Sequence, residues 1–536
     1  ILKMLASAIA SILIATPRPP PGPGCAGRNI PIANQSSPTG KGDCPGNQVI
    51  HNASCGGPNG VQWELKPTFH VGSKCHGEND PNGPFYDAKH GVYHLFFQDH
   101  IPMQVGGHLA TTDFIHWKRL PIAIWPDQWY DKDAIWTFSA TIVPGVGPRI
   151  VYPGIAGPNA SLGDCSNKPP PPHHRQQDSA FVPTGAGCFT HALARPSNRS
   201  DPWLRNWSKP PSVNPIVTDH INSKGRDPTT AWRIASGGGT EWRYTDAHQD
   251  VYSTHDWKHF THVGVMNWSY TGDCPDFYPL PRACDGCIDS SAAPPTVATA
   301  TAGAARGSTQ PTHVAASIHY TIGIYEEGAA NTSGTWTPLT PLPVGPLDGS
   351  APKYYYAAKS FADTAAAAPR GSRAGLATRS NAETTRRIVW GWIRIGGAAL
   401  EIDDARGVLY PGFHPGGCDT TGLVQTNVNS LPREVTYDAA LGILLFFPLV
   451  ELTQLRGDVL GSIATPTRIR TGQQVPIGSG SSGSGDGWLH SELRVAFALP
   501  LAAGTRVGIE MRGGTRADGT RFSVEIFAEY VDAAAG

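Results

Sequence analysis

The sequence predicts an all-β protein. Residues 59–455 consist of short apolar and aromatic runs separated by Gly, Pro, Asn and Asp, which are the residues that favour turns. Few stretches show the helical period that a long amphipathic helix would require. The runs at residues 91–97, 387–393 and 442–447 are examples of the expected strands. We therefore expect sheets of short strands joined by turns throughout this region.

The N-terminal segments differ in composition from this region. In residues 1–16, Lys3 precedes an apolar run with small residues, a pattern that is typical of a secretory signal and too short to span a bilayer. Because residue 1 is Ile, we expect the natural chain to begin upstream. A membrane anchor in that upstream segment is compatible with the sequence. Residues 17–58 are rich in Pro and Gly and predict an irregular lead-in.

The C-terminal residues 456–536 predict a separate region. Residues 478–487 are rich in Gly and Ser, which indicates a flexible linker. Strand-like alternation follows at residues 492–500 and 521–530.

Composition indicates a secreted protein with a neutral ligand. The net charge is −1 and 16% of the 536 residues are charged, so no basic field attracts nucleic acid or an anionic membrane surface. The ten cysteines are compatible with disulfides in an oxidising compartment. Cys284 and Cys287 form an isolated CxxC pair, for which we favour disulfides over zinc. No metal or cofactor is predicted.

Glycosylation is the second indication of secretion. Seven Asn-x-Ser/Thr triplets predict N-glycans and hence an extracellular or vacuolar location reached through the secretory pathway. They begin at Asn34, Asn52, Asn159, Asn198, Asn206, Asn267 and Asn331.

The segment Asn-Asp-Pro-Asn-Gly at residues 79–83 carries the first candidate catalytic carboxylate. Asp80 lies between two carboxamides, Pro and Gly set a tight turn, and the strand that follows ends at Gln98. Amides that bond hydroxyl groups, mounted beside a carboxylate on a rigid strand, suit the cleavage of a sugar. The same residues are equally good turn formers, so the segment alone favours neither interpretation.

Two more carboxylates follow in turn-like segments. Asp227 lies in Arg-Asp-Pro, 147 residues after Asp80 (227 − 80), and Asp273 lies in Gly-Asp-Cys-Pro-Asp-Phe, 46 residues further on (273 − 227). A retaining glycosidase needs one carboxylate as nucleophile and one carboxylic acid as proton donor. Asp227 also fits a structural turn in which it pairs with Arg226.

In this order the three segments resemble glycoside hydrolase family 32, which comprises invertases, fructan hydrolases and fructosyltransferases. The resemblance covers residues 67–456. It includes further matching segments at residues 120–123, 126–131, 136–141, 355–361, 389–393 and 430–433.

The resemblance implies a five-bladed β-propeller over residues 59–455, followed by a C-terminal β-sandwich. The blades are implied by the resemblance only, because no internal repeat is apparent from the sequence. Residues 456–536 are too few for the whole sandwich, so we expect a truncated one.

The resemblance also implies roles for individual residues. Asp80 matches the nucleophile, which forms a covalent fructosyl-enzyme, and Asp227 matches the transition-state stabiliser. Asp273 takes the position of the general acid and base. The expected substrate-binding residues are Asn79, Gln98, Trp136, Phe138, Ser139 and Arg226.

The chain departs from the family at Asp273, where the family has Glu preceded by an aromatic residue. Aspartate is shorter by one carbon–carbon bond, about 1.5 Å. A displacement of that size can cost roughly 100-fold in rate. The segment before Asp273 is also about two residues short against the family pattern, and a shorter loop could move the backbone inward.

Three functions follow from these residues. The first is hydrolysis of sucrose or a fructan by double displacement. The second is fructosyl transfer to an acceptor sugar. The third is a carbohydrate-binding propeller whose proton donor is impaired, which the substitution at Asp273 favours and the intact Asp80 opposes.

Overall fold

The computed structural model describes the larger part of the chain. The described residues are 7–10, 70–71, 78–100, 104–132, 134–156, 188–217, 225–234, 240–268, 273–281, 311–317, 319–339, 345–346, 355–365, 385–393, 428–439, 442–457, 475, 495–498, 506–515 and 521–529. Two compact units are present: residues 22–284 with 298–452, and residues 1–21 with 285–297 and 453–536.

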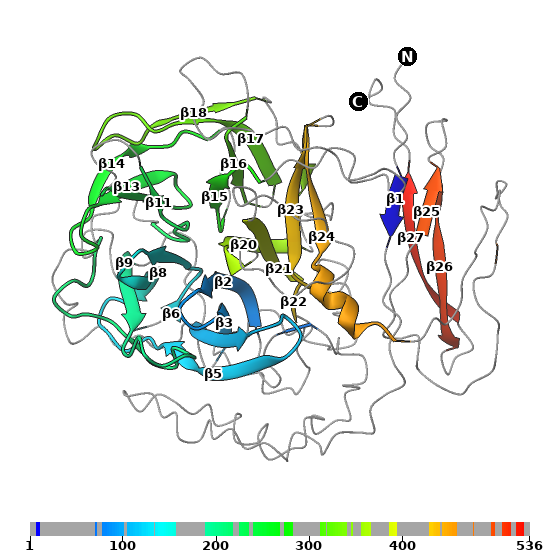
Figure 1. The fold of residues 1–536 in the computed structure, drawn as a ribbon, viewed down its shortest axis with the longest axis horizontal. Coiled ribbons are helices and arrows are strands. Elements are labelled where there is room, and N and C mark those ends of the chain that lie inside the picture. The colour runs from blue at the N-terminus through cyan, green and yellow to red at the C-terminus, as the bar shows by residue number, and fades with distance from the viewer. Residues whose placement is uncertain are drawn as a thin grey trace, which may run out of the picture. The chain divides into compact units, whose positions relative to one another are not determined.

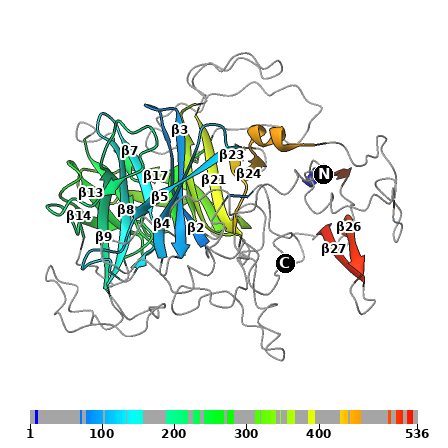
Figure 2. The same cartoon turned by 90° about the horizontal axis from the view of Figure 1, so that it is seen from below.

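The larger unit contains five antiparallel sheets, as predicted (Figure 1). They are the blades of the propeller and are numbered 1 to 5 in the order in which they occur along the chain. Blade 1 contains β2 (Glu78–Asp87), β3 (Val92–His100), β4 (Gln104–Thr111) and β5 (Trp117–Ile124). Figure 2 shows β2, β3 and β4 side by side. Blade 2 contains β6 (Ala134–Ile135), β7 (Ser139–Val143), β8 (Gly147–Ala156), β9 (Cys188–Pro196) and β10 (Trp207–Ser208).

The remaining three sheets follow the same pattern. Blade 3 contains β11 (Trp232–Arg233), β12 (Trp242–Thr245), β13 (Asp250–Thr254) and β14 (Thr261–Val265). Blade 4 contains β15 (Asp276–Pro279), β16 (His313–Ala316), β17 (His319–Glu326), β18 (Thr335–Pro338) and β19 (Gly345–Pro346). Blade 5 contains β20 (Tyr355–Asp363), β21 (Arg386–Ile393), β22 (Val428–Asn429), β23 (Arg433–Asp438) and β24 (Ile443–Pro448), and the 3-10 helix η8 (Val450–Leu455) follows it.

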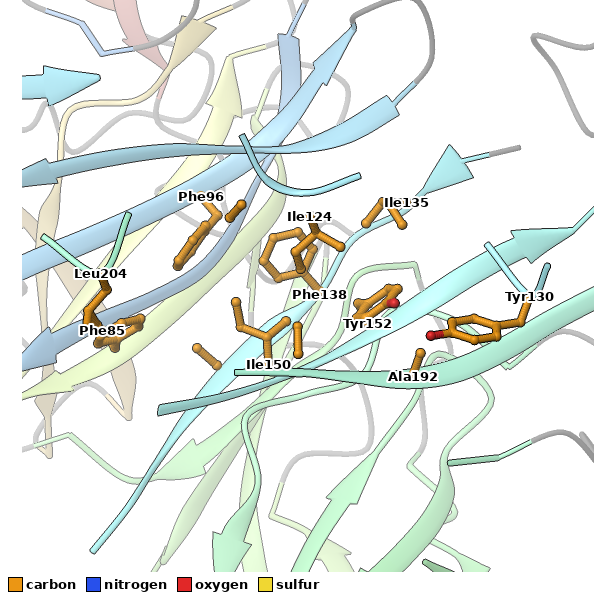
Figure 3. Packing of buried hydrophobic residues seen from close by; sticks show 13 residues of the cluster. Phe85, Phe96, Ile124, Tyr130, Ile135, Phe138, Ile150, Tyr152, Ala192 and Leu204 are labelled. Carbon is orange, nitrogen blue, oxygen red and sulfur yellow. The ribbon is translucent and has the colours of Figure 1, made fainter. Parts of the chain in front are cut away.

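The blades pack face to face, so that a hydrophobic core lies between one blade and the next. Ile150 and Tyr152 of β8 pack into the core between blades 1 and 2, whereas Val151 between them packs into the core between blades 2 and 3. Successive residues of a strand point to opposite faces, so one strand serves two cores. Figure 3 shows Phe96 of blade 1 and Phe138 and Ile150 of blade 2 gathered in the first of these cores.

The other neighbouring blades share cores in the same way. Val251 of blade 3 and Phe277 of blade 4 lie in one cluster, and Tyr278 of blade 4 packs with Val389 of blade 5 in the next.

Blade 5 meets blade 1 through side chains, and this contact closes the propeller. The ring centroids of Trp117 and Trp390 lie 6.3 Å apart, and the Tyr93 hydroxyl donates a hydrogen bond of 3.3 Å to Asp363. Arg386 donates to the same Asp363 carboxylate at 2.8 Å and to Glu451 at 2.6 Å. The Tyr93 hydrogen bond therefore connects the first blade to the last, and the two ion pairs connect the last blade to η8.

A turn motif recurs between the last two strands of blades 1 and 3, although it is too short to mark the blades as an internal repeat. The motif reads Thr-x-Asp-aromatic-x-His-aromatic at residues 111–117 and 254–260. In both copies the Thr hydroxyl accepts the backbone N–H of the first aromatic residue, which has a positive φ, and the His bonds the Asp carboxylate.

The smaller unit contains two two-stranded ladders. β25 (Val495–Ala498) and β27 (Arg521–Glu529) lie within the two predicted strand segments, and the pairing of β27 with β26 (Arg506–Thr515) was not predicted. β1 (Ser7–Ala10), within the signal-like segment, pairs with β25. The predicted truncated β-sandwich stays a prediction. The boundaries at residues 16, 58 and 455 stay predictions, and residues 17–58 lie outside the described part. In the part that is described, no helix is long and apolar enough to cross a membrane.

Candidate active site

A β-bulge presents Asp80. Asn79 pairs with Gln98 and Pro81 pairs with Phe97, which leaves Asp80 as the extra residue of β2. Such a bulge disrupts the ladder and re-aims the side chain at its centre. Asp80 is 6% exposed, so this carboxylate faces the protein interior and its hydrogen-bond donors.

Four side chains donate hydrogen bonds to the Asp80 carboxylate. Asn79 Nδ2 donates to Oδ1 at 3.0 Å, while Gln98 Nε2 and Cys274 Sγ each approach Oδ2 to 3.4 Å. Thr137 Oγ1 also donates to Oδ2. Burial raises the pKa of Asp80, and the hydrogen bonds from Thr137, Cys274 and Asn79 oppose this rise by stabilising the charged form.

Asp227 has a left-handed backbone, with a φ of 57°. Its Oδ2 accepts the backbone N–H of Cys274 at 3.0 Å and lies 3.4 Å from Nε of Arg226. Burial raises the pKa of Asp227 to about 6, Arg226 opposes the rise, and the negative charge of Asp273 adds to it. Because a non-Gly residue with positive φ is strained, its neighbours must hold this conformation.

Asp273 is the most accessible of the three carboxylates, with 46% of its side chain exposed. Arg226 Nη2 donates to Oδ1, and the Tyr356 hydroxyl donates to Oδ2 at 2.9 Å. The Ser317 hydroxyl donates to the backbone carbonyl of Asp273 at 2.6 Å. Asp273 is therefore anchored at both carboxylate oxygens and at the backbone.

Cys274 and Arg226 bring the three carboxylates together. Cys274 follows Asp273, and it contacts Asp80 through its thiol and Asp227 through its N–H. Arg226 precedes Asp227 and bonds both Asp227 and Asp273. Cys274 is a free, buried thiol, and burial raises its pKa well above the ordinary value.

The predicted binding residues fall into two groups. Asn79 and Gln98 lie at the Asp80 carboxylate, and Asn79 Nδ2 also donates to Gln98 Oε1 at 2.8 Å. Gln98 Nε2 bonds Thr137, which the sequence analysis did not single out. Arg226 lies between Asp227 and Asp273.

The second group comes from residues 136–139. Phe138 is 0% exposed and packs in the core between blades 1 and 2, which corrects the prediction that it lines a subsite, because its ring offers no surface to a sugar. Trp136 is partly buried and packs against Phe189. Ser139 is buried, and its hydroxyl has no hydrogen-bond partner within the described residues.

Asp276 occupies a structural position. Its Oδ2 accepts the backbone N–H of Ser360 at 2.9 Å and the Ser360 hydroxyl at 2.5 Å. Burial raises its pKa, and Lys359 opposes that rise. Asp276 thus joins blade 4 to blade 5.

Blade 5 supplies two residues that the sequence analysis did not assign to the site, Tyr356 and Lys359, both from β20. The segment at residues 355–361 marked the resemblance, but no residue in it had an expected role. The contacts of Tyr356 and Lys359 depend on a change of strand register that a sequence pattern does not reveal.

Within the described residues, no group of three or more His, Cys, Asp or Glu side chains is arranged to hold a metal ion.

Comparison with known proteins identifies the family. Residues 70–400, more than half of the 536, match the family described as glycosyl hydrolases family 32 N-terminal domain. The chain is 27% identical to acid beta-fructofuranosidase 4, vacuolar, of Arabidopsis thaliana, over 79% of this chain and 54% of that protein. It is 31% identical to acid beta-fructofuranosidase 1, vacuolar, of a Rosa hybrid cultivar, over 74% of this chain and 57% of that protein.

The chain spans about half the length of the curated relatives that it matches. Among solved structures, it is similar to fructan 1-exohydrolase IIa from Cichorium intybus, with 24% identity, a TM-score of 0.48, and coverage of 74% of this chain and 63% of that one. The match over residues 70–400 shows that the chain belongs to glycoside hydrolase family 32.

Proposed function

We propose that this protein is a retaining β-fructofuranosidase that hydrolyses the fructosyl linkage of sucrose or a fructan. The convergence of Asp80, Asp227 and Asp273, linked by Cys274 and Arg226, carries the proposal. The names of the relatives, acid beta-fructofuranosidases, support the substrate class.

In the first step Asp80 attacks the anomeric carbon of the fructosyl unit. A bond forms between an Asp80 oxygen and that carbon, the bond to the leaving oxygen breaks, and Asp273 gives the leaving oxygen a proton. The buried Asp227 carboxylate bonds the sugar hydroxyls more strongly as the ring gains positive charge. In the second step Asp273 accepts a proton from water, which attacks the same carbon and releases Asp80.

To act as the acid, Asp273 must carry a proton on a lone pair that its present hydrogen bonds leave open. Both of its oxygens already accept bonds, one from Arg226 and one from Tyr356. Proton delivery is therefore the step that the replacement of Glu by Asp slows most. The same observation favours the second candidate function, a fructan-binding propeller with an impaired proton donor.

Two classes of substrate separate these functions. Sucrose, inulin and levan need a proton on the leaving oxygen, whereas β-fructofuranosyl fluoride has a leaving group that needs little acid assistance. We expect the purified protein to release fructose from both classes, faster from the fluoride, and first as the β-anomer seen by NMR. An Asp80→Asn variant serves as the control and should release none.

The outcomes are distinct. Turnover of the fluoride alone would identify a nucleophile that works without an effective acid. Release from neither class, with fructan binding retained, would overturn the hydrolase proposal in favour of the binding propeller. Accumulation of longer fructans from sucrose would identify an acceptor sugar, rather than water, as the second substrate.

We also propose that the protein passes through the secretory pathway and carries N-glycans. Asn198, Asn206, Asn267 and Asn331 are exposed, which is compatible with modification, and Asn34, Asn52 and Asn159 lie outside the described residues. Treatment of protein from a eukaryotic host with an endoglycosidase should increase its mobility on a denaturing gel. Unchanged mobility would contradict glycosylation.

A further inference from the structure

A β-bulge in β20 aims two side chains at the catalytic loops. Tyr356 pairs with Trp392 and Lys359 pairs with Trp390, so three steps along β20 match two along β21. In a regular strand, residues three apart point to opposite faces. The extra residue cancels this alternation, so Tyr356 and Lys359 point to the same side. Tyr356 contacts Asp273 there, and Lys359 lies deeper.

The bulge contains a strained residue. Ala357 has a φ of 51°, a left-handed conformation that is unfavourable for a residue with a Cβ. Asp227 and Cys274, which also have positive φ, belong to the same site. Strain of this kind persists only where surrounding contacts hold it, and it concentrates at functional sites.

Lys359 is a buried cation with two backbone partners. Its side chain is 1% exposed, and its Nζ donates to the carbonyl of Pro275 at 2.7 Å and to that of Pro228 at 3.2 Å. Pro228 directly follows Asp227, and Pro275 directly follows Cys274. One ammonium group thus ties the loop of blade 3 that carries Asp227 to the segment that carries Asp273.

The charge of Lys359 is compensated by the site itself. Burial lowers its pKa, while the negative charges of Asp276, Asp227 and Asp80 favour the protonated form. A buried ammonium without such neighbours would be strongly unfavourable. The carboxylates and the lysine therefore stabilise one another.

We propose that Lys359 is a positioning residue that sets the location of Asp227 and Asp273 relative to each other by bonding the Pro228 and Pro275 carbonyls. This inference rests on the proposed fructosidase function. Displacement of catalytic groups by about 1 Å can lower the rate on the order of 100-fold, so the effect falls on turnover. Substrate affinity depends more on Asn79 and Gln98, which Lys359 does not contact.

The test compares Lys359→Met, Lys359→Arg and Lys209→Met. Methionine keeps the length and loses the charge and the donors, whereas arginine keeps both charge and donors. Lys209 is the control, because it is partly buried and bonds the Trp125 carbonyl, Asp127 and Asp131 of another network. Melting temperatures of all variants establish that each is folded at the assay temperature.

We expect Lys359→Met to lower kcat on sucrose and on β-fructofuranosyl fluoride by about 100-fold, with KM changed less than about threefold. Lys359→Arg should recover part of the lost kcat, and Lys209→Met should keep the parental kcat at a lowered melting temperature. A folded Lys359→Met with parental kcat, or a loss confined to KM, would overturn the inference. An inactive parent protein would instead overturn the proposed function, on which this inference depends.

Discussion

The thiol of Cys274 donates to Oδ2 of Asp80 across 3.4 Å. This contact joins residues 194 positions apart (274 − 80), from blades 1 and 4. It places the residue beside the proposed acid in direct contact with the proposed nucleophile. The hydrogen bond favours the charged form of Asp80 and so opposes the effect of burial on its pKa.

Cys274→Ala removes this donor. The pKa of Asp80 should rise further, so the acidic limb of the pH dependence of kcat/KM moves to higher pH. A hydrogen bond of this kind contributes about 1 kcal/mol, which corresponds to a roughly fivefold loss of rate at the acidic end. Cys274→Ser, which keeps a donor, is the control and should leave the limb nearer its original position. An unchanged profile for Cys274→Ala would show that the thiol does not act on Asp80.

Asp273→Glu restores the length that family members have at this position. If reach limits proton delivery, sucrose hydrolysis should rise between roughly 10-fold and 100-fold, while turnover of β-fructofuranosyl fluoride stays within about threefold. Initial rates on the two substrates measure this directly. A variant no faster than its parent on sucrose would indicate that the loop before Asp273 already compensates for the shorter side chain.

Arg386→Met removes the ion pairs that join β21 to β20 and to η8. The variant leaves the buried carboxylates of Asp363 and Glu451 without their cation, and breaking a buried ion pair costs about 3 to 5 kcal/mol. The free energy of unfolding from urea denaturation should fall by that amount. Arg205→Met, which removes an exposed ion pair with Asp201, should change it by less than about 1 kcal/mol. Equal effects of the two variants would contradict the role assigned to Arg386.

The buried pair His94 and His108 makes stability depend on pH. Their ring nitrogens lie 2.9 Å apart, and burial lowers the pKa of His94 from 6.5 to about 3 and that of His108 well below its ordinary value. The unfolded chain therefore binds protons below pH 6.5 that the folded chain excludes, and stability falls as the pH decreases from about 6.5.

The matched experiment replaces both histidines. The double variant His94→Leu/His108→Leu removes both partners and leaves no single unpaired ring, so its stability should fall less steeply between pH 6.5 and 4. Urea denaturation at several pH values measures the two slopes. Parallel slopes would assign the acid sensitivity to other groups.

The all-β fold class was predictable because β-strands depend on local sequence patterns. Alternating apolar residues and turn-forming residues mark β-strands without knowledge of partners, and all five described blades consist of them. The turn motif of blades 1 and 3 was also readable, but its two copies are 143 residues apart (254 − 111), and the variable lengths between blades conceal any regular period.

Sequence patterns were enough to predict the β-strands and the three carboxylate segments with Asn79, Gln98 and Arg226. Only the tertiary structure decided that Phe138 is a core residue, that Cys274 is a free thiol in contact with Asp80, and that Tyr356 and Lys359 belong to the site. Sequence patterns report which residue types stand at which spacing. Bulges at Asp80 and Ala357 change the direction of side chains, and the packing of distant blades sets their contacts. Both depend on strand partners far along the chain, which no local pattern specifies.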